Sequence, residues 1–224
     1  MLLTSGLNSS PVLTELQKKV LVGFFAHSFL SKHFYLTGGT ALSAFYLEHR
    51  FSEDLDFFTH DQPLEHLPKI FTDFCQTLHL ACEHMTISPS YQRFLVDHQL
   101  KIDFVKDIPF RVGVPLSTPE GILVDSIENI ASNKITAMLG RLEPKDYVDL
   151  YFILNETELK LETIFEWAKN KDGGLESFVW ASLLGDAQNF QILPQMIRPL
   201  SLNQLKTFYA SLRKKLISSF KPQP

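Results

Sequence analysis

Two aspartates separated by one residue are the feature of this sequence that points most directly to chemistry. Asp54 and Asp56 fall in residues 54–58, a stretch typical of a β-strand, where alternate side chains point to the same face. Two such close carboxylates repel each other, so the pair is unfavourable unless a cation lies between them. Magnesium, which prefers carboxylate and phosphate oxygens, is the cation we expect. Solvated acids at the end of a strand are the alternative, and a bare pair leaves both open.

A pair of glycines precedes the carboxylates by one predicted helix. Gly38 and Gly39 follow residues 34–36, an apolar run that predicts a buried strand, and they lead into a predicted helix over residues 40–48. The backbone amides of such a turn bind phosphate groups, although an isolated glycine pair is more often a plain turn. A phosphate-binding turn so close to paired carboxylates favours a nucleotide bound together with a metal ion.

Charged residues also interrupt two apolar segments. Asp103 lies within the predicted strand 99–106, where it could complete a three-carboxylate metal site beside the aspartate pair or face water on an edge strand. Lys134 lies on the apolar stripe of a predicted helix over residues 126–139, and Arg141 follows seven residues later. Cations held there would suit the charge of a triphosphate. Snorkelling of the lysine at the margin of the stripe is the alternative.

The next predicted helix begins near Pro144 and carries Asp146 and Asp149 outside its apolar face. An acid in the first turn complements the helix dipole, which explains Asp146 without any chemistry. Asp149 lies deeper in a strongly apolar segment and is harder to explain in that way. A surface network of these acids with Arg141 or Lys145 is the simplest interpretation of the cluster.

The elements that position these residues change in character along the chain. The first part predicts helices over residues 14–30 and 64–80 and strands near 83–88, 91–97 and 99–106. Residues 109–119 carry three prolines and a glycine, which suggests a domain crossing. Beyond them, Asp125 is expected to cap the helix over 126–139, and three more helices are predicted at residues 159–169, 175–184 and 201–218.

Composition indicates a soluble globular protein of one large or two small domains. The chain has 224 residues, of which 45% are hydrophobic and 21% charged, and no run approaches the length of a membrane span. Cys75 and Cys82 have no metal-site spacing and are expected to be reduced thiols. With no signal peptide pattern at its start, we expect the chain in the cytoplasm without a membrane partner.

Charge is distributed unevenly along the chain. All 25 acidic residues lie at or before Asp186, and the net charge is −4. The last 38 residues contain only basic charges, at Arg198, Lys206, Arg213, Lys214, Lys215 and Lys221. This basic tail could bind the phosphates of a nucleic acid, or it could be an ordinary solvated helix face.

Several of these motifs together resemble one known family. The run YLTGGTALSAFYLEHRFSEDLDFFT, residues 35–59, resembles the signature of the AbiEii/AbiGii-type toxin nucleotidyltransferases of the DNA polymerase β-like superfamily. The segment Arg141-x-x-x-Lys145-Asp146-x-x-Asp149-Leu150 resembles the last motif of that family, and Asn133-Lys134 with Ala137 resembles the preceding one. The resemblance covers about residues 30–155 in the expected order.

The resemblance implies an α+β nucleotidyltransferase fold with a mixed sheet in residues 1–112 and a helical domain in residues 113–224. It also implies magnesium-dependent transfer of a nucleoside monophosphate from an NTP. The implied nucleotide-binding residues are Gly38, Gly39, Thr40, Ser52, Lys134 and Arg141. The implied metal ligands are Asp54, Asp56 and Asp103, and the implied catalytic residues are Asp54, Asp56, Lys134, Asp146 and Asp149.

The acceptor of the nucleotide is the least defined part of the expectation. Members of the family act as toxins of toxin–antitoxin or phage-abortive systems, and some modify the acceptor end of tRNA, so we expect tRNA as substrate and an antitoxin protein as partner. A small hydroxylated molecule, as in aminoglycoside-modifying relatives, or a protein side chain is an alternative acceptor. A catalytically weak protein that works by docking a partner is an alternative from a different class.

Overall fold

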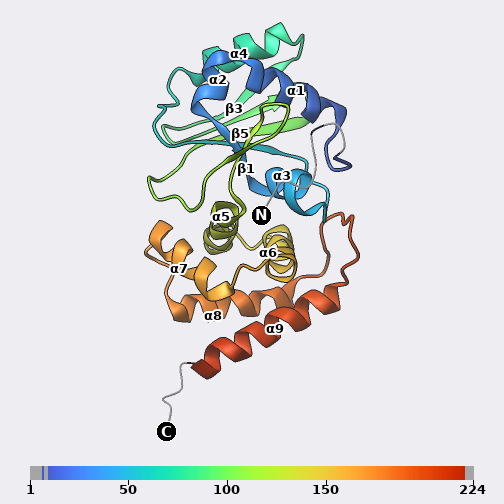
Figure 1. Cartoon of the computed structure of the whole chain (residues 1–224), viewed down its shortest axis with the longest axis vertical. Coiled ribbons are helices and arrows are strands. Elements are labelled where there is room, and N and C mark those ends of the chain that lie inside the picture. Colours follow the sequence, from blue (N-terminus) through green and yellow to red (C-terminus); the bar gives the residue numbers. More distant parts are fainter. Residues whose placement is uncertain (1–6, 8–9, 220–224) are drawn as a thin grey trace. The chain divides into compact units, whose positions relative to one another are not determined.

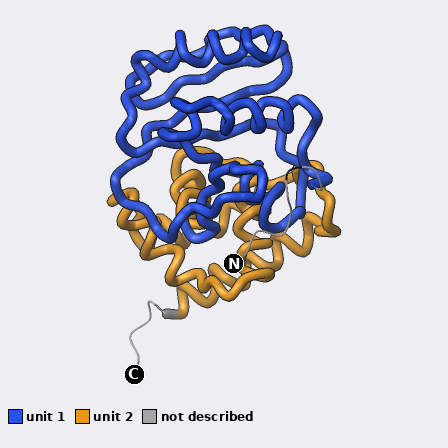
Figure 2. The backbone as a smooth tube through the Cα atoms, turned by 45° about the horizontal axis from the view of Figure 1, so that its top comes forward, with its two compact units in different colours: residues 1–130 blue, residues 131–224 orange. Residues whose placement is uncertain are grey.

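The computed structural model of the chain describes residue 7 and residues 10–219. The chain divides into two compact units, residues 1–130 and residues 131–224 (Figure 2). This division falls inside helix α5 (Ile127–Gly140), whereas the sequence-based boundary lies at 112/113. The difference arises because the chain after residue 113 returns to the sheet of the first unit as β6 (Leu116–Ser117) and β7 (Leu123–Val124).

The first unit is built on a seven-stranded mixed sheet with the strand order β3-β4-β5-β2-β1-β7-β6. The remaining strands are β1 (Tyr35–Thr37), β2 (Leu55–Thr59), β3 (Cys82–Ile87), β4 (Tyr91–Val96) and β5 (Leu100–Lys106). Strand β2 is antiparallel to β1 and parallel to β5, while β4 is antiparallel to both β3 and β5. The mixed sheet confirms the predicted α+β class.

Three helices cover one face of this sheet. Helices α1 (Glu15–Ala26), α2 (Ser28–His33) and α4 (Leu67–Thr77) gather on the same side (Figure 1). The single helix predicted over residues 14–30 is wrong, because the backbone at His27 is extended (φ −80°, ψ 118°) and ends α1. The His27 imidazole then accepts a hydrogen bond from the Leu30 amide and caps α2.

Phenylalanine side chains fill the space between these helices and the sheet. Phe24 of α1 stacks on Phe57 of β2 with ring centroids 3.8 Å apart. Phe34, Phe74 and Phe104 pack against Phe24, and Phe71 and Phe94 pack in turn against Phe104. Because side chains alternate along a strand, the neighbours of Phe57 and Phe104, which are Asp56 and Asp103, point to the opposite face of the sheet.

The helix predicted over residues 40–48 forms in two parts. Helix α3 (Gly38–Leu42) continues as a π-helix, η1 (Ser43–Leu47), which ends at Glu48 in the left-handed region with φ of 48°. All five residues of η1 are buried, as expected for a segment that is apolar almost all round. These two elements connect the glycine pair to the loop that carries the aspartates.

The start of α5 differs from the predicted capping arrangement. The hydroxyl of Ser126, not the carboxylate of Asp125, accepts the hydrogen bond from the Asn129 amide. The Asp125 carboxylate is fully buried and instead accepts hydrogen bonds from Thr37 and from the Arg111 guanidinium at 2.8 and 2.7 Å. Burial raises the pKa of Asp125, although Arg111 and the hydrogen bonds act in the opposite direction.

The second unit is helical. Besides the second part of α5 it contains α6 (Pro144–Glu156), α7 (Leu161–Lys171), α8 (Ser177–Asp186), the short 3-10 helix η2 (Ala187–Asn189) and α9 (Leu202–Ser219). Its core is aromatic: Tyr147 packs edge-to-face on Tyr209, whose hydroxyl donates to the Tyr147 carbonyl at 2.7 Å. Within the described ranges, no helix is both long and apolar enough to cross a membrane.

Candidate active site

The glycine turn and the second aspartate of the pair are in direct contact. Thr37, the last residue of β1, pairs with Asp56 of β2, so the chain turns into Gly38 beside the Asp56 carboxylate. Gly38 has φ of 74°, and a Cβ atom there would collide with that carboxylate. Glycine is therefore required at this position for two reasons: the positive φ, and the lack of space for a Cβ atom beside the Asp56 carboxylate.

The second glycine lies against a cation that the sequence analysis left without a role. A Cβ atom at Gly39 would collide with the Arg50 guanidinium and would lie 3.1 Å from the Ser52 hydroxyl. Arg50 is 3% exposed, and its Nη1 donates to the Phe51 carbonyl at 2.8 Å. The sequence signal that could have identified Arg50 is its position between the apolar segment 40–48 and the aspartate pair. The Arg50 guanidinium therefore places a buried positive charge against the glycine turn.

The loop from Glu48 to Asp54 is anchored through its backbone carbonyls. Three side chains donate to these carbonyls: Gln17 to Ser52, Thr40 to Asp54 and Ser43 to Arg50. Thr40, expected to bind the nucleotide, is fully buried, and its hydroxyl is used in this anchoring. The side chain of Thr40 therefore sets the position of Asp54, which directly precedes β2.

The structure places Asp103 beside Asp56 on an interior strand of the sheet, so the first of its two sequence-based alternatives holds for its position and the edge strand is wrong. In the parallel pairing of β2 with β5, Asp103 lies directly opposite Asp56. Its carboxylate is not open, because Arg93 of β4 donates to both oxygens at 2.7 Å. Among the described residues, no three His, Cys, Asp or Glu side chains form a group that could hold a metal ion. The half-exposed carboxylates of Asp54 and Asp56 fit a hard divalent cation, and a three-carboxylate site would require Arg93 to move.

The other predicted residues meet in the second unit, around one buried ammonium group. The Lys134 ammonium lies 3.0 Å from the Asp146 carboxylate and 2.6 Å from the Asp149 carboxylate. The Lys134 side chain is 6% exposed and both carboxylates are 0% exposed. Arg141, half-exposed, adds a hydrogen bond from Nε to Asp146 at 2.9 Å, while Lys145 pairs with Glu143 instead.

The cations of this cluster favour the ionised form of Asp146. Burial alone would raise the pKa of Asp146, but Lys134 and Arg141 outweigh it, so the pKa is lowered. Because the folded-state pKa lies below the unfolded value of about 3.9, the ionised carboxylate contributes stability above about pH 4, and this contribution is lost as the pH falls through the folded value.

Comparisons with known proteins assign the chain to a family. Residues 19–207 match the family described as nucleotidyl transferase AbiEii toxin, type IV TA system. The chain belongs to this family. An uncharacterized protein of Aquifex aeolicus is 31% identical over 148 residues, which are 62% of this chain and 66% of that protein, so the match spans slightly less than two thirds of the relative.

Two solved structures share the fold of this chain. JHP933 from Helicobacter pylori has a TM-score of 0.56 at 21% identity, with 92% of each chain covered. MenT4, a nucleotidyltransferase toxin from Mycobacterium tuberculosis, has a TM-score of 0.58 at 12% identity, with 92% of this chain and 83% of MenT4 covered. The likeness extends over both units, so the helical unit is part of the shared architecture.

Removing the ammonium from the buried cluster tests whether it stabilises the second unit. Lys134→Ala leaves two carboxylates buried without their main counter-ion, so we expect unfolding to become easier by about 3–5 kcal/mol in urea titrations. The control is Lys145→Ala, which removes a partly exposed pair and should cost under about 1 kcal/mol. Equal stabilities of the two variants would contradict the described cluster.

Proposed function

We propose that this chain is a magnesium-dependent nucleotidyltransferase that moves a nucleoside monophosphate from an NTP to RNA, with tRNA as the acceptor, as the toxin of a toxin–antitoxin pair. The contact between the Asp56 carboxylate and the Gly38 turn is the observation that carries this proposal. It combines a metal ligand and a phosphate-binding turn at one point of the sheet. Family membership supports the toxin role and the antitoxin partner.

In the proposed mechanism the first unit binds the triphosphate. The amides of Gly38 and Gly39 donate to phosphate oxygens, and the Ser52 hydroxyl lies beside them. Arg50, fixed against Gly39, contributes positive charge where negative charge accumulates during transfer. Asp54 and Asp56 would hold the metal ion, which neutralises the triphosphate and favours attack by the acceptor hydroxyl when it is bound.

The buried cluster has a separate part in the proposal. Asp146 and Asp149 hold the Lys134 ammonium in one position, so a catalytic lysine there would act from a fixed site. Arg141, with a side chain that is 45% exposed, is the member of the cluster best able to reach an anionic ligand. The catalytic role of Lys134, Asp146 and Asp149 and the nucleotide contacts of Lys134 and Arg141 stay predictions from the family motifs.

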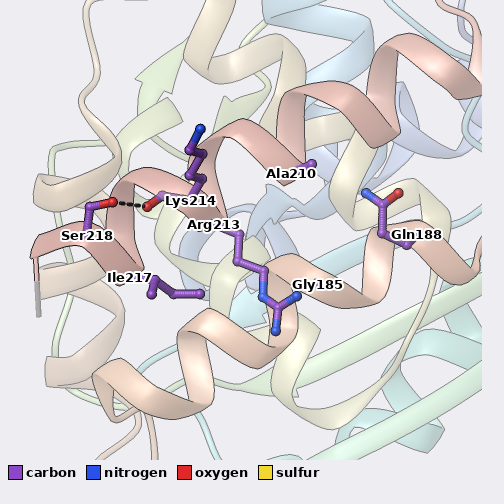
Figure 3. Close-up of a pocket in the computed structure, with 7 residues that line it drawn as sticks. All are labelled: Gly185, Gln188, Ala210, Arg213, Lys214, Ile217 and Ser218. Atoms are coloured by element: carbon purple, nitrogen blue, oxygen red, sulfur yellow. Dashed lines mark hydrogen bonds between the residues drawn. The ribbon is translucent and has the colours of Figure 1, made fainter.

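The basic tail offers a surface for the RNA acceptor. Figure 3 shows Arg213 turned toward Gly185, in a cavity of about 400 Å³ beside α9, whereas Lys214 points away from Gly185. Arg213 Nε donates to the Ala181 carbonyl at 3.1 Å, so this arginine fastens α9 to α8. Lys214 and Lys215 are exposed and are the better candidates for phosphate contacts.

Other cations of the tail are placed differently. Arg198 pairs with Glu156 at 2.8 Å, and Lys206 is partly buried. Lys221 lies outside the described residues. Among the cations of the tail that the structure describes, these placements favour Lys214 and Lys215 as the residues that contact RNA.

Substitution of Asp56 tests the enzymatic part of the proposal. With Mg²⁺, labelled NTPs and total tRNA, the unchanged chain should label RNA, and Asp56→Asn should reduce the labelling by at least about a hundredfold, since a metal ligand is lost. The matched control is Asp73→Asn on the exposed surface of α4, which should retain full activity. Equal activity of Asp56→Asn and the unchanged chain would contradict the proposal.

The same assay separates the alternative functions. If the unchanged chain labels an added aminoglycoside or a protein but not RNA, the acceptor is wrong and the nucleotidyl transfer is retained. If nothing is labelled with any NTP or acceptor, the third interpretation, a protein that only docks a partner, is favoured. The Asp56 carboxylate, in contact with the glycine turn, argues against that interpretation.

Neutralising the exposed lysines of α9 tests the RNA surface. Lys214→Ala combined with Lys215→Ala should weaken tRNA binding and reduce the slope of affinity against salt by up to about two, because each lysine accounts for at most one phosphate contact. Binding of NTP should not change. The control combines Lys19→Ala with Lys69→Ala, two exposed lysines of the first unit. Unchanged tRNA affinity in the α9 variant would exclude this surface.

A further inference from the structure

One row of charged residues crosses three neighbouring strands on the face of the sheet opposite the helices. Arg93 of β4 lies opposite Asp103 of β5, and Asp103 lies opposite Asp56 of β2. Asp103 is therefore the central member of the row, with a cation on one side and a metal-ligand candidate on the other. The register of the strands, rather than chance proximity of flexible side chains, sets this order.

The guanidinium engages the whole Asp103 carboxylate. Nε of Arg93 donates to Oδ1 and Nη2 donates to Oδ2, each at 2.7 Å, which is the bidentate geometry of a strong ion pair. The Asp103 side chain is 11% exposed and the Arg93 side chain is 37% exposed. A divalent cation binding to Asp103 would therefore be placed against a fixed positive charge, and the two cations would repel each other.

The guanidinium also lies near an aromatic ring of its own strand while it is paired with Asp103. Its Cζ atom lies 5.7 Å from the centre of the Tyr91 ring, within the range of a cation–π contact. The Tyr91 hydroxyl is also close to Asp103: burial, followed by the charge of Asp103, raises the pKa of Tyr91 to about 12. Because the Arg93 side chain is 37% exposed and lies on the face of the sheet opposite the phenylalanine core, its withdrawal from Asp103 into water would not open that core.

We propose that Arg93 is a positioning residue that controls whether Asp103 can act as a third metal ligand. With the ion pair closed, a divalent cation is held by Asp54 and Asp56 alone. With Arg93 withdrawn, Asp103 joins them and binding becomes tighter. The inference rests on the proposed function for the location of the metal site, and it adds an internal competitor for one ligand of that site.

Binding of Mn²⁺ alone, followed by the electron paramagnetic resonance of the free ion, tests this competition without any nucleotide or acceptor. Arg93→Gln should lower the Kd for Mn²⁺ roughly tenfold, corresponding to a coupling of typical size between contacting residues. Asp103→Asn alone should change the Kd less than twofold, because Arg93 already occupies that carboxylate. In the Arg93→Gln background, Asp103→Asn should remove the whole gain.

Two further variants make the result specific. Lys101→Gln removes a positive charge two residues before Asp103 on the same strand and should change the Kd less than twofold. Arg93→Lys keeps the positive charge but loses the bidentate hydrogen bonds to Asp103, so it should raise the Mn²⁺ affinity less than Arg93→Gln does. It replaces the glutamine variant in the test if that variant does not fold. An equal gain from Lys101→Gln would overturn the proposal, because the effect would then be general electrostatics.

The outcome also distinguishes this inference from the proposed function. If Mn²⁺ binds the unchanged chain and Asp56→Asn loses it, while both Arg93 variants leave the Kd unchanged, only the competition is overturned. A large loss of Mn²⁺ affinity in Asp103→Asn alone would also overturn it, because Asp103 would then be a ligand with Arg93 in place. If Asp56→Asn binds Mn²⁺ as the unchanged chain does, the metal site of the proposed function fails, and the inference fails with it.

Discussion

The candidate site depends on a carboxylate that lies where a side chain at Gly38 would have to be. Asp56 takes that position because β1 and β2 pair in a register that places it beside Thr37. Any larger residue at Gly38 would displace the carboxylate or the turn, and the positive φ there would add strain. One steric constraint thus joins the part of the chain that suits phosphate to the part that suits a metal ion.

The two units differ in how their buried carboxylates are paired with cations. In the first unit Asp103 is neutralised by a forked hydrogen bond from Arg93, on a surface that remains partly open. In the second unit Lys134 is enclosed with two carboxylates that have no exposure at all. Buried ion pairs of the second kind seldom add stability over apolar packing, so their retention is consistent with a role in positioning. The partly open pair is the one to which we assign the competition with a metal ion.

Local patterns predicted most elements because the responsible signals are short-range. Alternation placed β2 and β5, and Pro144 marked the start of α6 as predicted. The break at His27 was missed because nothing in helical periodicity signals a histidine that caps the following helix. The boundary at 112/113 followed the prolines, but long-range pairing of β7 with β1 keeps residues 113–130 with the sheet. Arg93 was missed for a similar reason, since its partner is ten residues away across a hairpin and depends on strand register.

Residue types in the sequence indicated which residues belong to the candidate site, but they did not indicate which atoms those residues contact. The pairing of Asp103 with the aspartate strand was foreseen, whereas the anchoring use of Thr40 and the enclosure of Lys134 depend on tertiary packing. The central claim is that the chain cleaves an NTP between its α- and β-phosphates and keeps the nucleoside monophosphate on the acceptor. Parallel reactions with α-labelled and γ-labelled NTPs and total tRNA test this most directly. The account predicts labelled RNA from the α-label only, and RNA labelled by the γ-label would contradict it.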